Sequence, residues 1–521
     1  MAMQNMGNPT AISSDFVRQI PSESVSAVPK KKRKRNRYAF MCAVFASMAS
    51  ILLGYEESVM NGGGTIIFIK ERFEVSDKEE EILLGMAYIY ATIGVVFAGR
   101  TSDYIGRRYT MVLAGFIFFF GAFLRSFATN YVSLMLGRFI TGLGTGYALV
   151  VSPIYIAEVS PSSCRGFFTS LSEVFINLGI MLGYFSKLLF SKLPIHLGWR
   201  FMAGFSIFPS MLFIIVALMI PESPRWLVMQ GQIGKAKWVL DKTLDSIEEA
   251  EGRLADIKEA NGIPSGHSSY EIIPLRVSTL DNLTINIWKE MFLHPTPANR
   301  HILIVIIGLH FFRQASGMNV VFLFIPEFFK RVGIKSKNNK LLVFVVIVGF
   351  IKTIFSLVPT FLLDRIGRRP LLLISVAGKM ISLMVLGFGV TKMNHHSNKW
   401  DMGLCITSIL IDVAFFFIGI GPITWVYGSE ILPTKLRAQG LSAGVIVNRV
   451  TAGVVTMTFI SLSKAITIGG VFFLYAGIAA MAWLFFYVLL PETQGRNLEN
   501  IEGLFGTSFF LIFWSNFQFM L

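Results

Sequence analysis

Apolar runs long enough to cross a lipid bilayer dominate this sequence. The hydrocarbon core of a bilayer is about 30 Å thick, and a helix needs about 20 apolar residues to cross it. Two groups of six such runs occur, at 38–60, 82–99, 109–128, 132–152, 166–189 and 201–220, and at 302–329, 341–363, 371–390, 405–427, 439–462 and 471–490. The pattern predicts an all-α membrane protein with twelve transmembrane helices in two six-helix halves.

The segments around these runs complete the predicted domain organisation. The basic tract 30–37 lies directly before the first run, which favours a cytoplasmic anchor over the alternative, a nuclear signal. An even number of spans then places both termini in the cytoplasm. We expect five parts: a cytoplasmic basic N-terminal tail 1–37, an N-terminal six-helix bundle 38–220, a cytoplasmic linker with amphipathic helices 221–300, a C-terminal six-helix bundle 301–490 and a cytoplasmic C-terminal tail 491–521.

Composition argues against several other classes of protein. Charged residues make up 15% of the chain, whereas a soluble domain has about 25%. The net charge of +15 comes largely from short basic tracts between apolar runs, as the positive-inside rule requires, so nucleic acid is not expected as a partner. The three cysteines and seven histidines match no metal-binding spacing, and the chain contains no Walker loop and no nucleophile elbow. We therefore expect neither an enzyme nor a bound metal.

Three short motifs of the first half recur in the second at a nearly constant spacing. The matching pairs are 103–108 (DYIGRR) with 364–369 (DRIGRR), 221–223 (PES) with 491–493 (PET), and Glu158 and Arg165 with Glu430 and Arg437. Each motif lies at the equivalent helix end of its half. The chain is therefore predicted to be a duplicated six-helix unit, the arrangement of transporters whose site lies between two halves.

The repeated charged residues all lie at the predicted cytoplasmic face and indicate a gate. Acidic and basic groups on facing helix ends can pair across the two halves while this face is closed, and they must separate when it opens. Ordinary solvated loop charge is the alternative, which repetition in both halves disfavours. The predicted cytoplasmic gate consists of Asp103, Arg107, Arg108, Glu158, Arg165, Asp364, Arg368, Arg369, Glu430 and Arg437.

These motifs resemble those of a known family. Segments 99–108 (GRTSDYIGRR), 221–226 (PESPRW) and 491–496 (PETQGR) resemble signatures of the sugar porter branch of the major facilitator superfamily, and the likeness runs from about residue 38 to 506. Four further segments resemble those of plant polyol/monosaccharide transporters: 172–177 (SEVFIN), 352–353 (KT), 421–427 (GPITWVY) and 447–450 (VNRV). The resemblance implies the major facilitator fold. Members of that subfamily are proton symporters for polyols and monosaccharides.

Glu56 and Arg138 are the candidates for proton coupling. A charge at membrane depth is costly, so each is a functional hypothesis by default. Both lie in the outer part of the predicted bilayer, in the first and fourth runs, which is compatible with an ion pair. In proton-coupled sugar porters the position of Glu56 is normally an aspartate that takes the proton and pairs with the fourth-helix arginine, and glutamate preserves this chemistry on a longer arm. The alternatives are that Glu57 carries the proton, or that both glutamates lie in a wet external vestibule.

Three further charges lie inside predicted spans. Lys352 and Arg449 match residues of the polyol subfamily, and Asp412 lies in the run 405–427. Each could face another helix as a structural charge or face the cavity, and Asp412 could simply pair with a neighbour.

A polyol or sugar is uncharged and carries many hydroxyls, so its site needs amide and carboxyl groups together with aromatic faces. The resemblance implies contacts on the fifth, seventh, tenth and eleventh helices. Interhelical hydrogen bonding is the alternative for any one of these residues. The predicted substrate-binding residues are Glu173, Arg313, Gln314, Asn319, Phe324, Trp425 and Asn448.

Two segments depart from the family pattern. Arg313 takes the place of the first glutamine in the motif that 310–319 (HFFRQASGMN) resembles. This cation could pair with Glu173 and reshape the pocket, bind a substrate with a carboxylate, or disable transport. Residues 323–325 (LFI) replace Tyr-Tyr-Ser or a similar sequence, so hydroxyls are lost there.

The combined features predict a proton-coupled symporter that imports polyols or monosaccharides by alternating access. Protons are the expected coupling ion, and no other cofactor is expected. An uncoupled facilitator of the same fold and a non-transporting sugar sensor are the alternatives. The expected partners are a small neutral polyol or monosaccharide and the lipid bilayer, and the expected location is the plasma membrane. The sequence assigns no oligomeric state.

Overall fold

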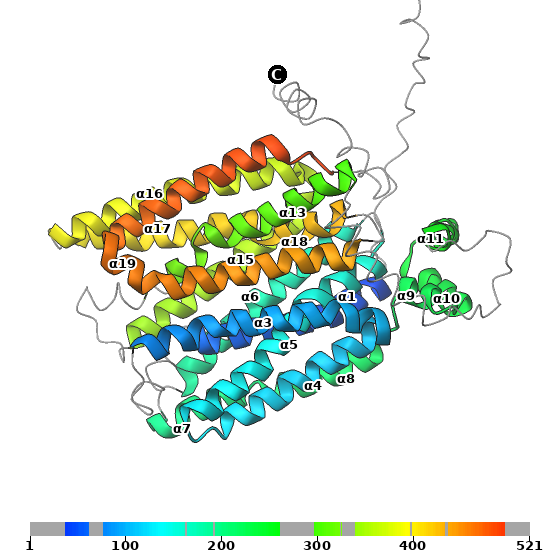
Figure 1. Ribbon diagram of the computed structural model, residues 1–521, viewed down its shortest axis with the longest axis horizontal. Coiled ribbons are helices and arrows are strands. Elements are labelled where there is room, and N and C mark those ends of the chain that lie inside the picture. Colours follow the sequence, from blue (N-terminus) through cyan, green and yellow to red (C-terminus); the bar gives the residue numbers. More distant parts are fainter. Residues whose placement is uncertain are drawn as a thin grey trace, which may run out of the picture. The chain divides into compact units, whose positions relative to one another are not determined.

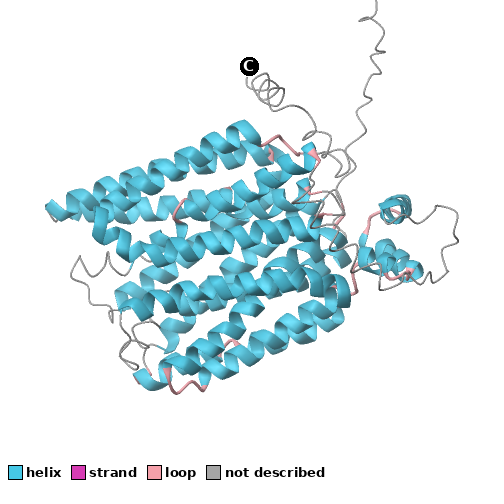
Figure 2. Cartoon of the chain, in the orientation of Figure 1, coloured by secondary structure: helices cyan, strands magenta, loops and turns pink. Residues whose placement is uncertain are grey.

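The computed structural model describes residues 37–61, 77–161, 164–190, 193–260, 296–322, 325, 339–395, 399–432 and 436–494. Apart from short turns these residues are helical, and none of them forms a strand (Figure 2). The all-α prediction is therefore confirmed for this part of the chain. Nearly all of both predicted tails, and the linker from residue 261 to 295, lie outside it.

The first half consists of five long helices and a broken sixth. They are α1 (Arg37–Asn61), α3 (Asp77–Ile105), α4 (Arg107–Ser126), α5 (Tyr131–Val159), α6 (Arg165–Phe190), α7 (Ile195–Gly204) and α8 (Ile207–Met219). Gly106 alone separates α3 from α4, with a φ of 93° that residues with side chains rarely adopt. A Cβ at Gly106 would lie 2.4 Å from the Glu222 carboxylate, so this turn requires glycine.

The second half repeats this plan. Its helices are α13 (Pro297–Ala315), α15 (Asn339–Ile366), α16 (Arg368–His395), α17 (Lys399–Ile418), α18 (Ile420–Ile431) and α19 (Arg437–Leu489). Gly367, with a φ of 101°, separates α15 from α16 as Gly106 separates α3 from α4. Gly419 divides one span into α17 and α18, two residues before the GP pair at 421–422. Thr467, with a φ of 66°, divides α19 into two helices.

Eleven helices among the described residues are long and apolar enough to cross a membrane. They correspond to every predicted span except 82–99. That span lies within α3, a helix of 29 residues that is not among the eleven. The length and composition of the helices therefore support eleven of the twelve predicted spans.

The two halves meet through two equivalent helix pairs. Helix α6 packs against α15, and α3 packs against α19 (Figure 1). The internal repeat relates α3 to α15 and α6 to the first part of α19, so these contacts are the same contact made twice. Within the first half α1 packs on α6, where a Cβ at Gly54 would lie 1.9 Å from the carbonyl oxygen of Ile176. A glycine at such a position lets two membrane helices approach closely.

Three short helices follow the first half and pack at one end of it (Figure 1). They are α9 (Pro224–Met229), α10 (Ile233–Thr243) and α11 (Ile247–Ala260), and they share a small apolar core of their own. Arg253 of α11 donates to the carbonyl oxygens of Ser160 at 2.7 Å and Glu158 at 3.0 Å. These bonds satisfy acceptors at the end of α5 that have no partner within the helix, and they attach the three helices to the bundle.

Candidate functional site

Three adjoining hollows between the halves hold most of the predicted site. The central hollow contains Glu173, Arg313, Gln314, Asn319 and Trp425. The Glu57 hollow lies between α1, α3, α6, α15 and α19, beside the residues that follow α13, and the α5 hollow lies between α1, α3, α4, α5 and α19. Glu57 lines all three, so the hollows are parts of one polar region.

An ion pair between the halves lines the central hollow. Arg313 Nη2 of α13 donates to both carboxylate oxygens of Glu173 of α6, at 3.1 and 3.3 Å. Trp425 Nε1 of α18 donates to Glu173 Oε2 at 2.9 Å, and the guanidinium lies over the Trp425 ring. The Arg313 and Glu173 side chains are only 7% and 3% exposed. Of the three interpretations of Arg313, the structure therefore favours pairing with Glu173.

A second cluster joins Gln314 to Asn448. Asn448 Oδ1 accepts hydrogen bonds from Gln314 Nε2 at 3.2 Å and from Arg449 Nη2 at 2.9 Å. Asn448 Nδ2 donates to the carbonyl oxygen of His310 at 3.3 Å. These two predicted contacts therefore bond each other across α13 and α19, which is the interhelical alternative.

Two side-chain amide atoms of residues that line the central hollow have no hydrogen-bond partner within the described structure. They are Asn177 Oδ1, on the fully buried side chain of α6, and Asn319 Nδ2. A buried polar atom without a partner is costly, and a ligand hydroxyl can supply the missing bond. Asn319 thus lines the hollow and its contact with substrate stays a prediction, Asn177 is an added candidate, and Phe324 lies outside the described residues.

Glu56 pairs with a different arginine from the one expected. Its carboxylate forms a buried ion pair with Arg125 of α4, whereas the Arg138 guanidinium donates to the carbonyl oxygen of Leu83 on α3. The predicted Glu56–Arg138 ion pair is therefore corrected to Glu56–Arg125. All three charged residues line the α5 hollow, and it is Arg125, in the last turn of α4, whose guanidinium contacts the Glu56 carboxylate.

The other intramembrane charges divide into a structural pair and two residues that line the hollows, Lys352 and Arg449. Asp412 pairs with Lys379 at 3.0 Å, both side chains are 0% exposed, and Ser382 donates to the same carboxylate. Asp412 thus has the neighbour that one interpretation predicted. Lys352, in contrast, lines two of the hollows, and its ammonium lies 3.3 Å from the centroid of the Phe322 ring.

Arg107, at the start of α4, is the centre of a charged cluster at one end of the first half. Its guanidinium contacts Asp103 and Glu158, each at 3.1 Å. The backbone N–H groups of Arg107 and Arg108 donate to the Glu222 carboxylate at 2.9 and 3.2 Å. Burial raises the pKa of Glu222 above its usual range, although these donors and the Arg107 charge act in the opposite direction.

The duplicated residues build the same cluster in the second half. Arg368 Nη2 contacts Glu430 Oε1 at 2.8 Å. The backbone N–H groups of Arg368 and Arg369 donate to the Glu492 carboxylate at 3.0 and 2.9 Å. We call the end of the bundle that carries both clusters the charged end. The motifs that repeat in the sequence therefore hold helices together within each half.

The predicted pairing across the two halves at the charged end stays a prediction. The side chains of Asp364 and Arg437 lie outside the described residues, and Arg165 is half-buried at the start of α6. One described contact does cross between the halves, because Gln439 Nε2 of α19 donates to Asp103 Oδ2 at 3.5 Å.

Comparison with known proteins identifies the family to which this architecture belongs. A family model described as "Sugar (and other) transporter" matches residues 42–505. The chain belongs to this transporter family. Its members are transporters and not enzymes, and the chain is a multi-pass membrane protein of the major facilitator fold.

The relatives of this transporter confirm the resemblance to plant polyol transporters. It is 53% identical to Polyol transporter 5 of Arabidopsis thaliana over 501 residues, which cover 96% of this chain and 91% of the relative. Putative polyol transporter 1 of the same plant is 52% identical over 476 residues, 91% of this chain and 92% of the relative. The proton:xylose symporter XylE bound to 6-bromo-6-deoxy-D-glucose has a TM-score of 0.76 at 26% identity, covering 90% of this chain and 99% of its own. An inward-open structure of XylE from E. coli has a TM-score of 0.67 at 25% identity, covering 90% of this chain and 100% of its own.

Sequence reasoning missed two charged partners in this transporter. Arg125 and Lys379 both lie inside predicted spans, and each turns out to neutralise a carboxylate that had been singled out. A charge within an apolar run was the available signal, because such a charge needs a partner. Applied to every run, that rule would have found both.

Proposed function

We propose that this transporter imports a small neutral polyol or monosaccharide together with a proton, by alternating access between its two halves. The single observation that carries the proposal is the buried Glu56–Arg125 ion pair, which lies in a hollow that shares Glu57 and Arg449 with the central hollow. The names of the Arabidopsis relatives, and of the proton:xylose symporter with the same fold, support the substrate class and the coupling ion.

Protonation of Glu56 is the proposed coupling step. The ionised carboxylate neutralises Arg125, whose side chain is 1% exposed. A proton on Glu56 removes that attraction and leaves the guanidinium free to find another acceptor. Because Glu56 and Arg125 lie on α1 and α4 of one half, the change alters how these helices pack beside the substrate. A proton would then bias which conformation is stable.

The central hollow suits an uncharged substrate. Glu173 and Arg313 neutralise each other there, and the free amide atoms of Asn177 and Asn319 match hydroxyl groups. The Trp425 ring supplies an aromatic surface. The second interpretation of Arg313, a partner for a substrate carboxylate, has less support because the charge of Arg313 is already neutralised by Glu173.

The proposed orientation places the charged end and both termini in the cytoplasm of a cell whose plasma membrane holds the transporter. The TM-score with the sugar-bound XylE structure, 0.76, exceeds the TM-score with the inward-open XylE structure, 0.67. The state that we propose has the charged end closed, with its two arginine clusters intact as they are in this structure. Predicted pairs across this end, together with the Arg107 and Arg368 clusters, would then separate or shift during inward opening.

Uptake of radiolabelled sorbitol, xylitol, myo-inositol and glucose into transport-deficient yeast tests the proposal. We expect accumulation above the external concentration at acidic pH, and collapse with a protonophore. Glu56→Gln should abolish accumulation while retaining exchange of the labelled substrate across the membrane. Glu79→Gln, at an exposed carboxyl on α3, is the matched control and should behave as the unaltered chain does.

The remaining outcomes discriminate the alternatives. Uptake that equilibrates without accumulation and ignores pH would identify an uncoupled facilitator. A surface-expressed protein that moves none of the four compounds would refute the proposed substrate class and favour a sensor.

A further inference from the structure

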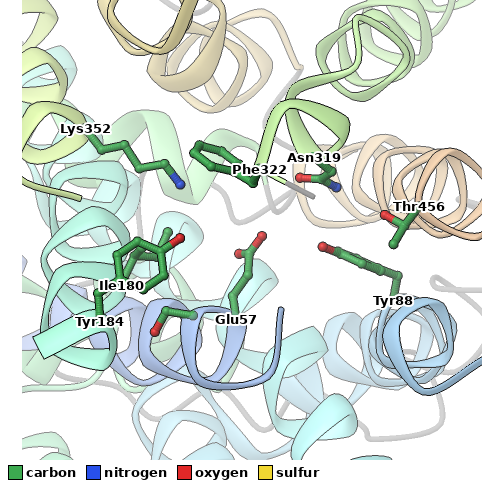
Figure 3. A pocket seen from close by; sticks show the side chains of 9 residues that line it. Glu57, Tyr88, Ile180, Tyr184, Asn319, Phe322, Lys352 and Thr456 are labelled. Atoms are coloured by element: carbon green, nitrogen blue, oxygen red, sulfur yellow. The ribbon is translucent and has the colours of Figure 1, made fainter. Parts of the chain in front are cut away.

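The predicted substrate contacts satisfy one another in this structure. Both oxygens of Glu173 are taken by Arg313 and Trp425, and Asn448 Oδ1 is taken by Gln314 and Arg449. Hydrogen-bonding capacity for a substrate must therefore come in part from elsewhere. The Glu57 hollow, which adjoins the central one, contains such capacity (Figure 3).

Glu57 is the carboxylate that lines this hollow. None of the hydrogen bonds or ion pairs among the described residues involves it, although its neighbour Glu56 is tightly paired. Figure 3 shows its side chain rising from α1 into the hollow, towards Asn319 and Phe322. A carboxylate offers only acceptors and is expensive to hold without donors in a partly buried place.

Lys352 reaches the same hollow from α15 of the other half (Figure 3). The residue is 3% exposed, and none of the hydrogen bonds or ion pairs among the described residues involves its ammonium, which lies over the rings of Phe322 and Phe417. An ammonium has three donors and no acceptor, and ring faces do not replace hydrogen bonds to oxygen. Asn319, whose Nδ2 also lacks a partner, lines the same hollow and lies on the side of Glu57 away from Lys352 (Figure 3).

We propose that Glu57 and Lys352 bind two hydroxyls of the same polyol from the two halves of the transporter, with Asn319 as a third contact. A hydroxyl both donates and accepts, so one polyhydroxylated molecule supplies the donor that Glu57 lacks and the acceptor that Lys352 lacks. A carboxylate and an ammonium from opposite halves that share one ligand also draw the halves together around it. Glu57 is then a specificity-determining residue, distinct from the proton-binding Glu56.

This inference rests on the proposed function, because it assigns the hydroxyl contacts of the proposed substrate. It predicts that binding requires at least two hydroxyls, and that loss of a hydroxyl bound by either residue weakens binding. It also predicts that the Glu57 effect depends on Lys352, since both act through one ligand.

Transport kinetics of Glu57→Gln, Glu57→Leu and Lys352→Met test the pair, with sorbitol as the probe and Glu79→Gln as the control. A hydrogen bond to a charged group is strong enough that Glu57→Leu should raise KM about 10- to 100-fold, with Glu57→Gln between it and the unaltered chain. Combining Glu57→Leu with Lys352→Met should raise KM by less than the product of the single effects. Accumulation against the gradient in Glu57→Gln should survive at saturating sorbitol, because Glu56 is intact.

A second measurement separates substrate contact from a structural role. Sorbitol should raise the melting temperature of the purified, unaltered transporter, and Glu57→Leu should remove that increase without lowering the ligand-free melting temperature. An unchanged KM in Glu57→Leu, or effects of Glu57 and Lys352 that simply multiply, would overturn the inference alone. Loss of accumulation in Glu57→Gln with KM intact would also overturn it, by making Glu57 the proton carrier. Absence of all polyol and sugar uptake by the unaltered chain would instead overturn the proposed function, and the inference with it.

Discussion

The Glu173–Arg313 ion pair gives the sharpest prediction, because each side chain is nearly excluded from water. Arg313→Gln leaves the Glu173 carboxylate with Trp425 as its remaining described donor, and Glu173→Gln leaves a buried guanidinium without its counter-charge. Removing one partner of a buried pair costs about 3–5 kcal/mol, since the remaining charge loses its compensation. This corresponds to a factor of roughly 100 to several thousand in an equilibrium constant.

The double variant Glu173→Gln/Arg313→Gln removes both charges together. It leaves a neutral pair that can still form hydrogen bonds, and it should be destabilised by less than either single variant, because no buried charge is left without its partner. The single variants should therefore be the less stable proteins, and the double variant should recover most of the loss.

Thermal unfolding of the purified proteins in detergent, followed by the fluorescence of a thiol-reactive dye, measures these changes. Surface expression and sorbitol uptake in yeast give the functional counterpart, with Lys237→Gln in α10 as a control ion-pair deletion at the surface. A surface pair contributes about 0–1 kcal/mol, so the control should barely shift the melting temperature. If the losses in melting temperature of the two single variants add up in the double variant, the two charges do not stabilise each other and the reasoning is refuted.

Two further predictions follow from the same principles. Lys379→Met should destabilise the second half by about 3–5 kcal/mol, because Asp412 is then a buried charge without its described counter-ion, and adding Asp412→Leu should restore most of the melting temperature. For Glu222 the raised pKa means that the folded protein binds the proton more tightly than the unfolded chain. Its contribution to stability therefore falls as pH rises through that pKa, and Glu222→Gln should flatten the decline in melting temperature between acidic and neutral pH. Equal pH slopes in both proteins would contradict this assignment.

Much of the fold followed from the sequence, because bilayer thickness fixes the length of an apolar run and duplication leaves repeated motifs. The two arginine clusters illustrate this, since the positions that repeat in the chain hold equivalent helix ends in space. The site was predicted less completely. Six of the seven proposed contacts lie on or beside the central hollow, but several of them bond one another instead of facing free space.

The choice of partners was decided by the tertiary structure. The sequence shows how deep a charged residue lies along its helix, yet it does not show which way the side chain points around the axis. Arg125 and Arg138 lie on two helices joined by a short turn, and both line the hollow that contains Glu56. In the packed structure the Glu56 carboxylate pairs with Arg125, and Arg138 donates to the carbonyl oxygen of Leu83 instead. The sequence by itself therefore determined which residues carry charge in the membrane and roughly at what depth. Only the packing of the helices decided which charges neutralise each other and which, like Glu57, are left facing the hollow.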